Sequence, residues 1–118
     1  MRKKILATAA VIALGLPGAA LAANDGVMDM CLDTGKPAEL CECASEKLKA
    51  DQGDDAYALY AGIGSRYLEA KAAGTPMGDA WDDAVRSEAE KGGRGFTTVL
   101  TQTNKLGKAH RQAMKACR

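Results

Sequence analysis

The four cysteines, Cys31, Cys41, Cys43 and Cys117, are the strongest candidates for chemistry in this 118-residue sequence. A thiol redox catalyst carries a Cys-x-x-Cys motif at a helix N-terminus, where a thiolate is stabilised. Here only Glu42 separates Cys41 from Cys43, and its negative charge disfavours a thiolate beside it. An even number of cysteines in a short exported chain is instead typical of a disulfide framework. The sequence therefore predicts two structural disulfides, with thiol redox chemistry as the alternative.

Binding of a soft metal is the other use that these sulfurs could have. Met28, Met30 and Cys31, together with Cys41 and Cys43, offer the soft ligands that select Cu(I). However, methionines two residues apart diverge on a helix, and cysteines that are oxidised no longer bind a metal. Zinc would need more cysteine or histidine ligands than the sequence supplies. We therefore expect no cofactor and no metal site.

Other catalytic arrangements also lack the residues they need. His110 is the only histidine, and it falls on the apolar side of a predicted helix, so we interpret it as a half-buried packing residue with one hydrogen bond. The calcium loop of an EF-hand needs Gly at its sixth position and Glu at its twelfth, where residues 51–62 have Ala56 and Gly62. We therefore predict that the protein is not an enzyme.

One face of the last predicted helix carries a row of basic residues, which are Lys105, Lys108, Arg111 and Lys115, with Arg118 following. Such rows are usually solvated helix faces, and cations also complement the negative end of the helix dipole. The preceding helix is acidic, so the charges are distributed unevenly. We treat the four basic residues as a possible interaction face for another envelope or periplasmic protein.

The N-terminal segment has the pattern of a bacterial signal peptide. Basic residues 2–4 precede an apolar run over residues 5–16, and Ala20-Leu21-Ala22 is a small-x-small cleavage site. The apolar run is shorter than the roughly 20 residues of a membrane-spanning helix. We expect a signal peptide over 1–22, no transmembrane segment after cleavage, and a periplasmic protein; full secretion is the alternative.

Removal of residues 1–22 leaves 96 residues, which suit a single disulfide-bonded helical domain over 23–118. The removed segment holds three basic and no acidic residues, so 13 basic and 15 acidic residues remain, a net charge of −2. This balance lacks the strongly basic character of a nucleic-acid-binding protein. Alanine is the main apolar residue, so the core buries little area per side chain and the crosslinks matter for stability.

Apolar residues recur at helical spacing throughout the exported part, and Gly and Pro separate the segments. We predict a short first helix that carries Val27, Met28 and Cys31 on one face, further helices near 38–50, 55–73, 76–91 and 96–117, and no strand. The fold class is all-α, a small bundle of four to five short helices stapled by two disulfides. Gly62 and Gly64 lie inside one helix at a cost of about 1 kcal/mol each, which favours a close helix–helix contact there.

Residues two apart on a helix project about 200° from each other, so Cys41 and Cys43 cannot bond to one another. Cys41 lies on the apolar stripe of its helix, and Cys117 ends the apolar stripe of the last helix. We therefore prefer Cys41–Cys117 with Cys31–Cys43, and the swapped pairing stays open. A bond to Cys117 closes a long loop worth about 4 kcal/mol, and the local bond is worth about 3 kcal/mol.

The leading hypothesis is a non-enzymatic binding or accessory module that recognises a partner protein or an envelope component. The alternative is a copper or thiol redox protein that uses Cys41 and Cys43. The state of the thiols distinguishes them, because the first hypothesis expects no free thiol and the second expects two.

Overall fold

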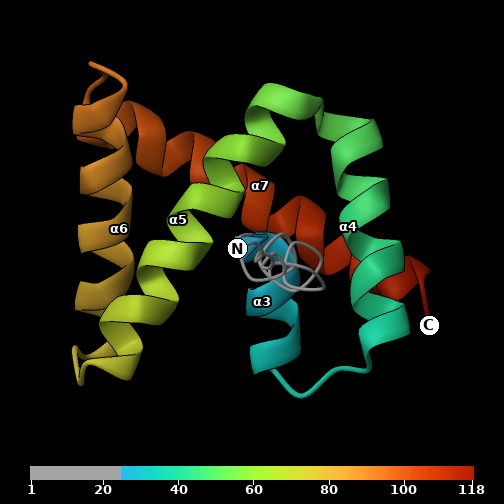
Figure 1. The fold of residues 1–118 in the computed structure, drawn as a ribbon. Helices are drawn as coiled ribbons and strands as arrows, with labels where there is room; N and C mark the ends of the chain where they lie inside the picture. The colour runs from blue at the N-terminus through green and yellow to red at the C-terminus, as the bar shows by residue number, and fades with distance from the viewer. Residues whose placement is uncertain (1–24) are drawn as a thin grey trace, which may run out of the picture.

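The computed structural model describes residues 25–118, which form five α-helices (Figure 1). These are α3 (Gly26–Asp33), α4 (Ala38–Gln52), α5 (Asp54–Ala72), α6 (Met77–Lys91) and α7 (Phe96–Ala116). The prediction of a small all-α bundle with two disulfides is confirmed. The predicted signal peptide lies outside the described residues. Within residues 25–118, every helix is too short or too polar to cross a membrane.

The helix ends follow from local backbone chemistry. Asp25 caps α3, because its Oδ1 atom accepts hydrogen bonds from the amides of Val27 and Met28 at 3.1 and 3.2 Å. Pro37 precedes α4 and has no amide hydrogen to satisfy, which suits the first turn of a helix. The junction between α4 and α5 is the single residue Gly53, whose φ of 92° is easily adopted only by glycine. Gly53 is also the N-cap residue of α5, and no side chain caps this helix.

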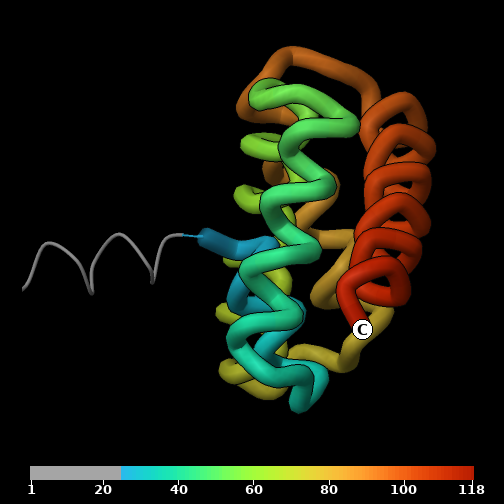
Figure 2. The backbone as a smooth tube through the Cα atoms, turned by 90° about the vertical axis from the view of Figure 1, so that its right-hand side faces the viewer, coloured from blue at the N-terminus to red at the C-terminus, as the bar shows by residue number. Residues whose placement is uncertain are grey.

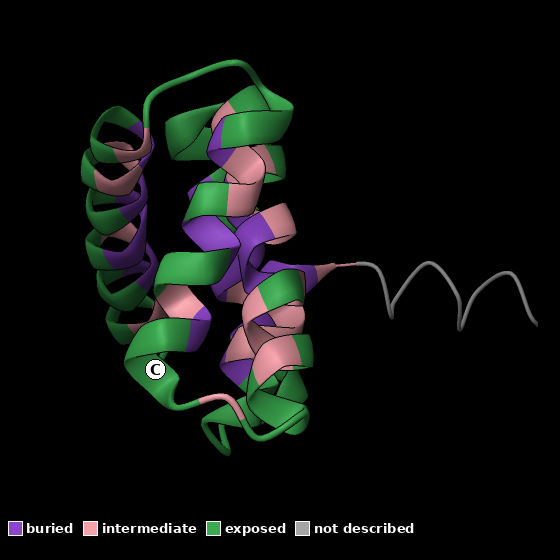
Figure 3. Cartoon of the chain, turned by 90° about the vertical axis from the view of Figure 1, so that its left-hand side faces the viewer, coloured by how far each residue is buried: buried purple, intermediate pink, exposed green. Residues whose placement is uncertain are grey.

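The helix α5 is the centre of the bundle. It packs against each of the other four helices, while α7 returns past α4 in the opposite direction (Figures 1 and 2). Buried residues lie on the faces that these helices turn toward one another, and the outer faces are exposed (Figure 3). One core cluster lies between α5, α6 and α7 and includes Ile63, Val85 and Val99. A second lies between α3, α4, α5 and α7 and includes Leu48 and Leu106.

The short helix α3 crosses α5 at glycines. A Cβ atom on Gly64 would lie 2.6 Å from Cε of Met30 and 2.8 Å from the carbonyl oxygen of Gly26. A Cβ atom on Gly26 would collide with the backbone oxygen of Ala61. The expected helix–helix contact is thus confirmed at Gly64, whereas Gly62 faces the carboxylate of Glu88 on α6.

The preferred cysteine pairing was wrong. The bonds are Cys31–Cys41 and Cys43–Cys117, with Cα–Cα distances of 5.6 and 6.0 Å. The turn between α3 and α4 folds the inner face of α3 onto the inner face of α4, so the core-facing Cys41 meets Cys31. Cys117 lies just beyond the end of α7 and reaches the flank of α4, where Cys43 projects. The exclusion of a Cys41–Cys43 bond is confirmed.

Reduction of both disulfides is expected to unfold most of the protein. The Cys43–Cys117 bond closes a 74-residue separation and the Cys31–Cys41 bond closes 10 residues, so the chain-entropy model assigns about 4 and 3 kcal/mol to them. Their sum is comparable to the whole stability of a small domain. Thermal melts followed by circular dichroism, with and without reductant, measure the effect. An unchanged melting temperature would contradict it.

The glycine crossing predicts that Gly64→Ala destabilises the protein by about 1–3 kcal/mol, because the added methyl group forces α3 away from α5. Gly78→Ala is the matched control, since a Cβ atom there has no neighbour within 4 Å. We expect the control to be neutral or up to about 1 kcal/mol more stable. Urea unfolding of both variants gives the two free energies, and equal effects would show that the crossing tolerates a side chain.

Candidate functional site

All four sulfurs of the cysteines are held in disulfides, and no free cysteine remains. Cys41 and Cys43 bond to different partners on opposite sides of α4. In this form neither residue offers a thiolate to a substrate or a metal ion. Residues 25–118 also contain no group of three or more His, Cys, Asp and Glu side chains placed around one point.

The lone histidine is more deeply buried than the sequence predicted. His110 is 3% exposed, and its ring stands edge-on to that of Tyr60 at a centroid distance of 5.7 Å. The expected hydrogen bond is absent at Nε2, which has no partner among the described residues. Burial lowers the pKa of His110, and the positive charge of Arg111 lowers it further. The imidazole is therefore neutral at neutral pH.

A polar group at the start of α3 has a structural role. The hydroxyl of Tyr57 on α5 donates to the carboxylate of Asp25, with distances of 2.8 and 3.0 Å to the two oxygens. Burial and this hydrogen bond raise the pKa of Tyr57 to about 12. Because Asp25 also caps α3, this one carboxylate fixes the first turn of α3 against α5.

A hollow of about 350 Å³ opens between the ends of α3 and α5, the start of α6 and the second half of α7. We name it the methionine hollow, because three thioether side chains line it. Sδ of Met114 lies 3.6 Å from Sγ of Cys31, so the first disulfide forms part of its wall. Tyr60 is 5% exposed, and burial raises the pKa of its hydroxyl to about 12. Its lining includes Met30, Tyr60, Met77, His110, Arg111 and Met114.

A second hollow, of about 230 Å³, lies where the C-terminal part of α7 meets the turn between α3 and α4. Leu40 and Met114 supply its apolar lining. Four cations surround it, and within residues 25–118 they form no ion pair. We name these four residues the basic end: Lys36, Arg111, Lys115 and Arg118.

The basic end shares two residues with the predicted interaction face. The four residues of the predicted face, Lys105, Lys108, Arg111 and Lys115, are all exposed on α7. Arg111 and Lys115 line the second hollow, whereas Lys105 and Lys108 do not. Lys36 was missed, because its position in the sequence gives no sign that the α3–α4 turn folds beside the end of α7.

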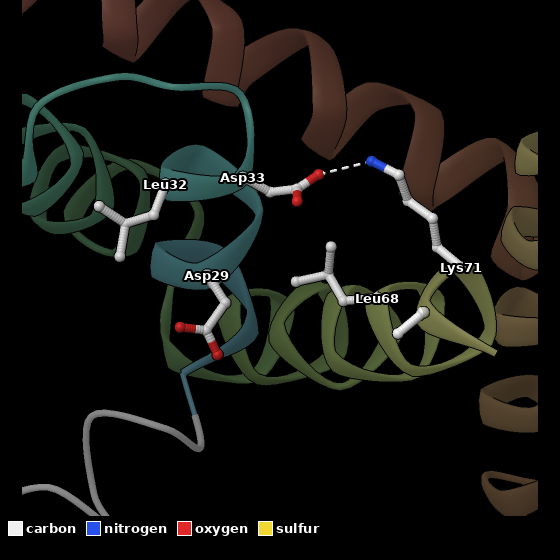
Figure 4. A pocket seen from close by; sticks show the side chains of 6 residues that line it. Asp29, Leu32, Asp33, Leu68 and Lys71 are labelled. Atoms are coloured by element: carbon white, nitrogen blue, oxygen red, sulfur yellow. Dashed lines mark hydrogen bonds and ion pairs between the residues drawn. The ribbon is translucent and has the colours of Figure 1, made fainter. Parts of the chain in front are cut away.

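A third hollow, of about 540 Å³, lies between α3 and α5 (Figure 4). Lys71 and Asp33 reach toward each other across it and form an ion pair of 2.7 Å. The hydrogen bond to Asp33 raises the pKa of Lys71. Both partners are well exposed, so the pair contributes little stability. The same two residues also line the methionine hollow, which makes the two hollows neighbours.

Comparison with known proteins gives no functional assignment, because the chain matches no family model, no curated protein and no solved structure. The site must therefore be interpreted from its own chemistry. Its charged and apolar parts come together only in the folded chain, on segments that are far apart in the sequence.

The buried histidine predicts a loss of stability in mild acid. Its pKa lies below the ordinary 6.5 in the folded protein, so below pH 6.5 the unfolded chain takes up a proton that the folded protein does not. The free energy of unfolding should fall by up to about 1.4 kcal/mol per pH unit as the pH drops below 6.5. Urea unfolding at pH 7.5, 6.5 and 5.5 measures this slope. His110→Leu should remove it, and the same slope in both proteins would exclude His110 as its source.

Proposed function

We propose that this protein is a non-enzymatic binding or accessory module that works outside the cytoplasm. Its basic end recognises a negatively charged group on a partner protein or on an envelope component. The observation that carries the proposal is that four cations from two distant segments surround one hollow, and none is neutralised by an acidic side chain within residues 25–118. Clustered charges of one sign attract an oppositely charged partner and increase its association rate.

The cysteine chemistry supports the proposed location. Two disulfides that consume every cysteine are typical of proteins in oxidising compartments. Together with the predicted signal peptide over residues 1–22, this favours the periplasm, with secretion as the alternative.

Two groups that could act as a general acid or base, the imidazole of His110 and the carboxylate of Asp25, are not placed for catalysis. Nε2 of His110 is buried without a partner, so it is not positioned against a nucleophile. The carboxylate of Asp25 is engaged by the α3 amides and by Tyr57. These surroundings favour binding over catalysis as the role of the molecule.

Charge removal at the basic end tests the proposal. The double variant Arg111→Gln/Lys115→Gln should lose at least about 80% of the component that the protein captures from the exported fraction of its cells, since each charge contributes about 0.5–1 kcal/mol. Cross-linking and mass spectrometry of both proteins and lipids identify the captured component. Added salt should release it by screening.

The control is Lys47→Gln/Lys91→Gln, which removes the same charge from exposed positions outside the basic end. It should capture as much as the unmodified protein. Equal capture by both double variants, or no capture by the unmodified protein, would refute a binding role for the basic end.

A further inference from the structure

We propose that the methionine hollow and the basic end form one binding site for a single-chain anionic amphiphile. The apolar chain lies in the methionine hollow, and the anionic head pairs with the cations of the basic end. This inference rests on the proposed function and names the ligand class of the same site.

The two hollows meet at shared residues. Arg111 and Met114 line both of them, so the charged part of the surface passes directly into the apolar part. One side chain supplies a cation and the other a flexible thioether. A ligand with a charged head and an apolar tail matches this arrangement, in which a charged surface lies beside an apolar one.

The apolar part is built to accept an irregular apolar chain. Met30, Met77 and Met114 come from three different helices, and methionine adapts its shape to its neighbours. Met77 and Leu32 are the two large hydrophobic side chains that residues 25–118 leave exposed, at 62 and 42%. Both lie on this surface, Met77 in the methionine hollow and Leu32 in the neighbouring hollow between α3 and α5. A volume of about 350 Å³ lies within the range of small-molecule sites, about 300–1,000 Å³.

The cation that the two hollows share favours an anionic head. Arg111 is the cation in its lining that makes no ion pair with the described residues, and Lys71 already pairs with Asp33. Nε2 of His110 is buried without a partner in the same lining. Thioethers and an imidazole are also ligands of Cu(I), but the positive charge of Arg111 acts on His110 and disfavours a cation beside it. A carboxylate or phosphate head is favoured by the same charge.

The fluorescence of the single tryptophan, Trp81, measures binding in the methionine hollow. Trp81 stands edge-on to Tyr67 and Tyr60, with ring centroids 5.4 and 6.4 Å away, and both tyrosines line the methionine hollow. The intact, oxidised protein is titrated with decanoate while the fluorescence of Trp81 is followed. We expect a saturable change with one equivalent bound. Octanoate should bind about tenfold more weakly, because it buries two fewer CH2 groups.

Control ligands separate the two halves of the site. Acetate has the head without the chain, and decyltrimethylammonium has the chain with the opposite charge. Neither should bind at the concentrations at which decanoate saturates. Equal affinities for octanoate and decanoate, or for decanoate and decyltrimethylammonium, would overturn the proposal.

Variants place the ligand in the structure. Arg111→Gln should weaken decanoate binding about fivefold to tenfold. Met77→Gln should weaken it about fivefold and is safe for folding, because Met77 is exposed. Lys47→Gln is the charge control and should bind as the unmodified protein does. Decanoate binding that none of these substitutions changes would show that it binds elsewhere.

The outcomes also separate this inference from the proposed function. If decanoate does not bind but Arg111→Gln/Lys115→Gln still loses its captured component, the amphiphile is refuted and the basic end remains a binding site. If the capture is also unaffected, both proposals fail.

Discussion

The helix α4 carries two covalent constraints that point in different directions. Cys41 faces the interior and holds α3, and Cys43, two residues later, lies on the flank and holds the end of α7. Because a helix turns about 200° over two residues, a single rigid segment can bridge both ends of the described chain. The hollows that make up the candidate site lie near these two bonds, with Cys31 in one wall and Leu40 of α4 in another.

The rest of the bundle compensates for small side chains by close approach. Glycines bring the backbones of α3 and α5 together, and the buried alanines of α4, α6 and α7 bury little area each. Trp81 and Leu59 pack against both core clusters and join them into one interior. Two large apolar side chains, Leu32 and Met77, are not part of this close packing and are exposed at the surface.

The positions of the helices could be predicted because each depends on local sequence. Proline, glycine and the apolar spacing mark their ends, and the buried residues of α7, which include Val99, Leu106 and His110, recur at helical spacing. The cysteine pairing depended instead on how the helices pack in three dimensions. Position on a stripe tells whether a residue faces inward, but it does not tell which helix lies opposite. The placement of Lys36 beside Arg111 and the convergence of three methionines were beyond prediction for the same reason.

The cysteines pair in the order in which they occur along the chain, so neither bond encloses the other. The first bond joins two residues of adjacent helices and needs nothing that follows Cys43 in the sequence. The second needs Cys117, which follows Cys43 by 74 residues. During synthesis, Cys43 therefore lacks its native partner until Cys117 has been added, 74 residues later. A chain cut short in α7 would leave Cys43 without this partner, and α4 would lose its covalent link to the end of α7.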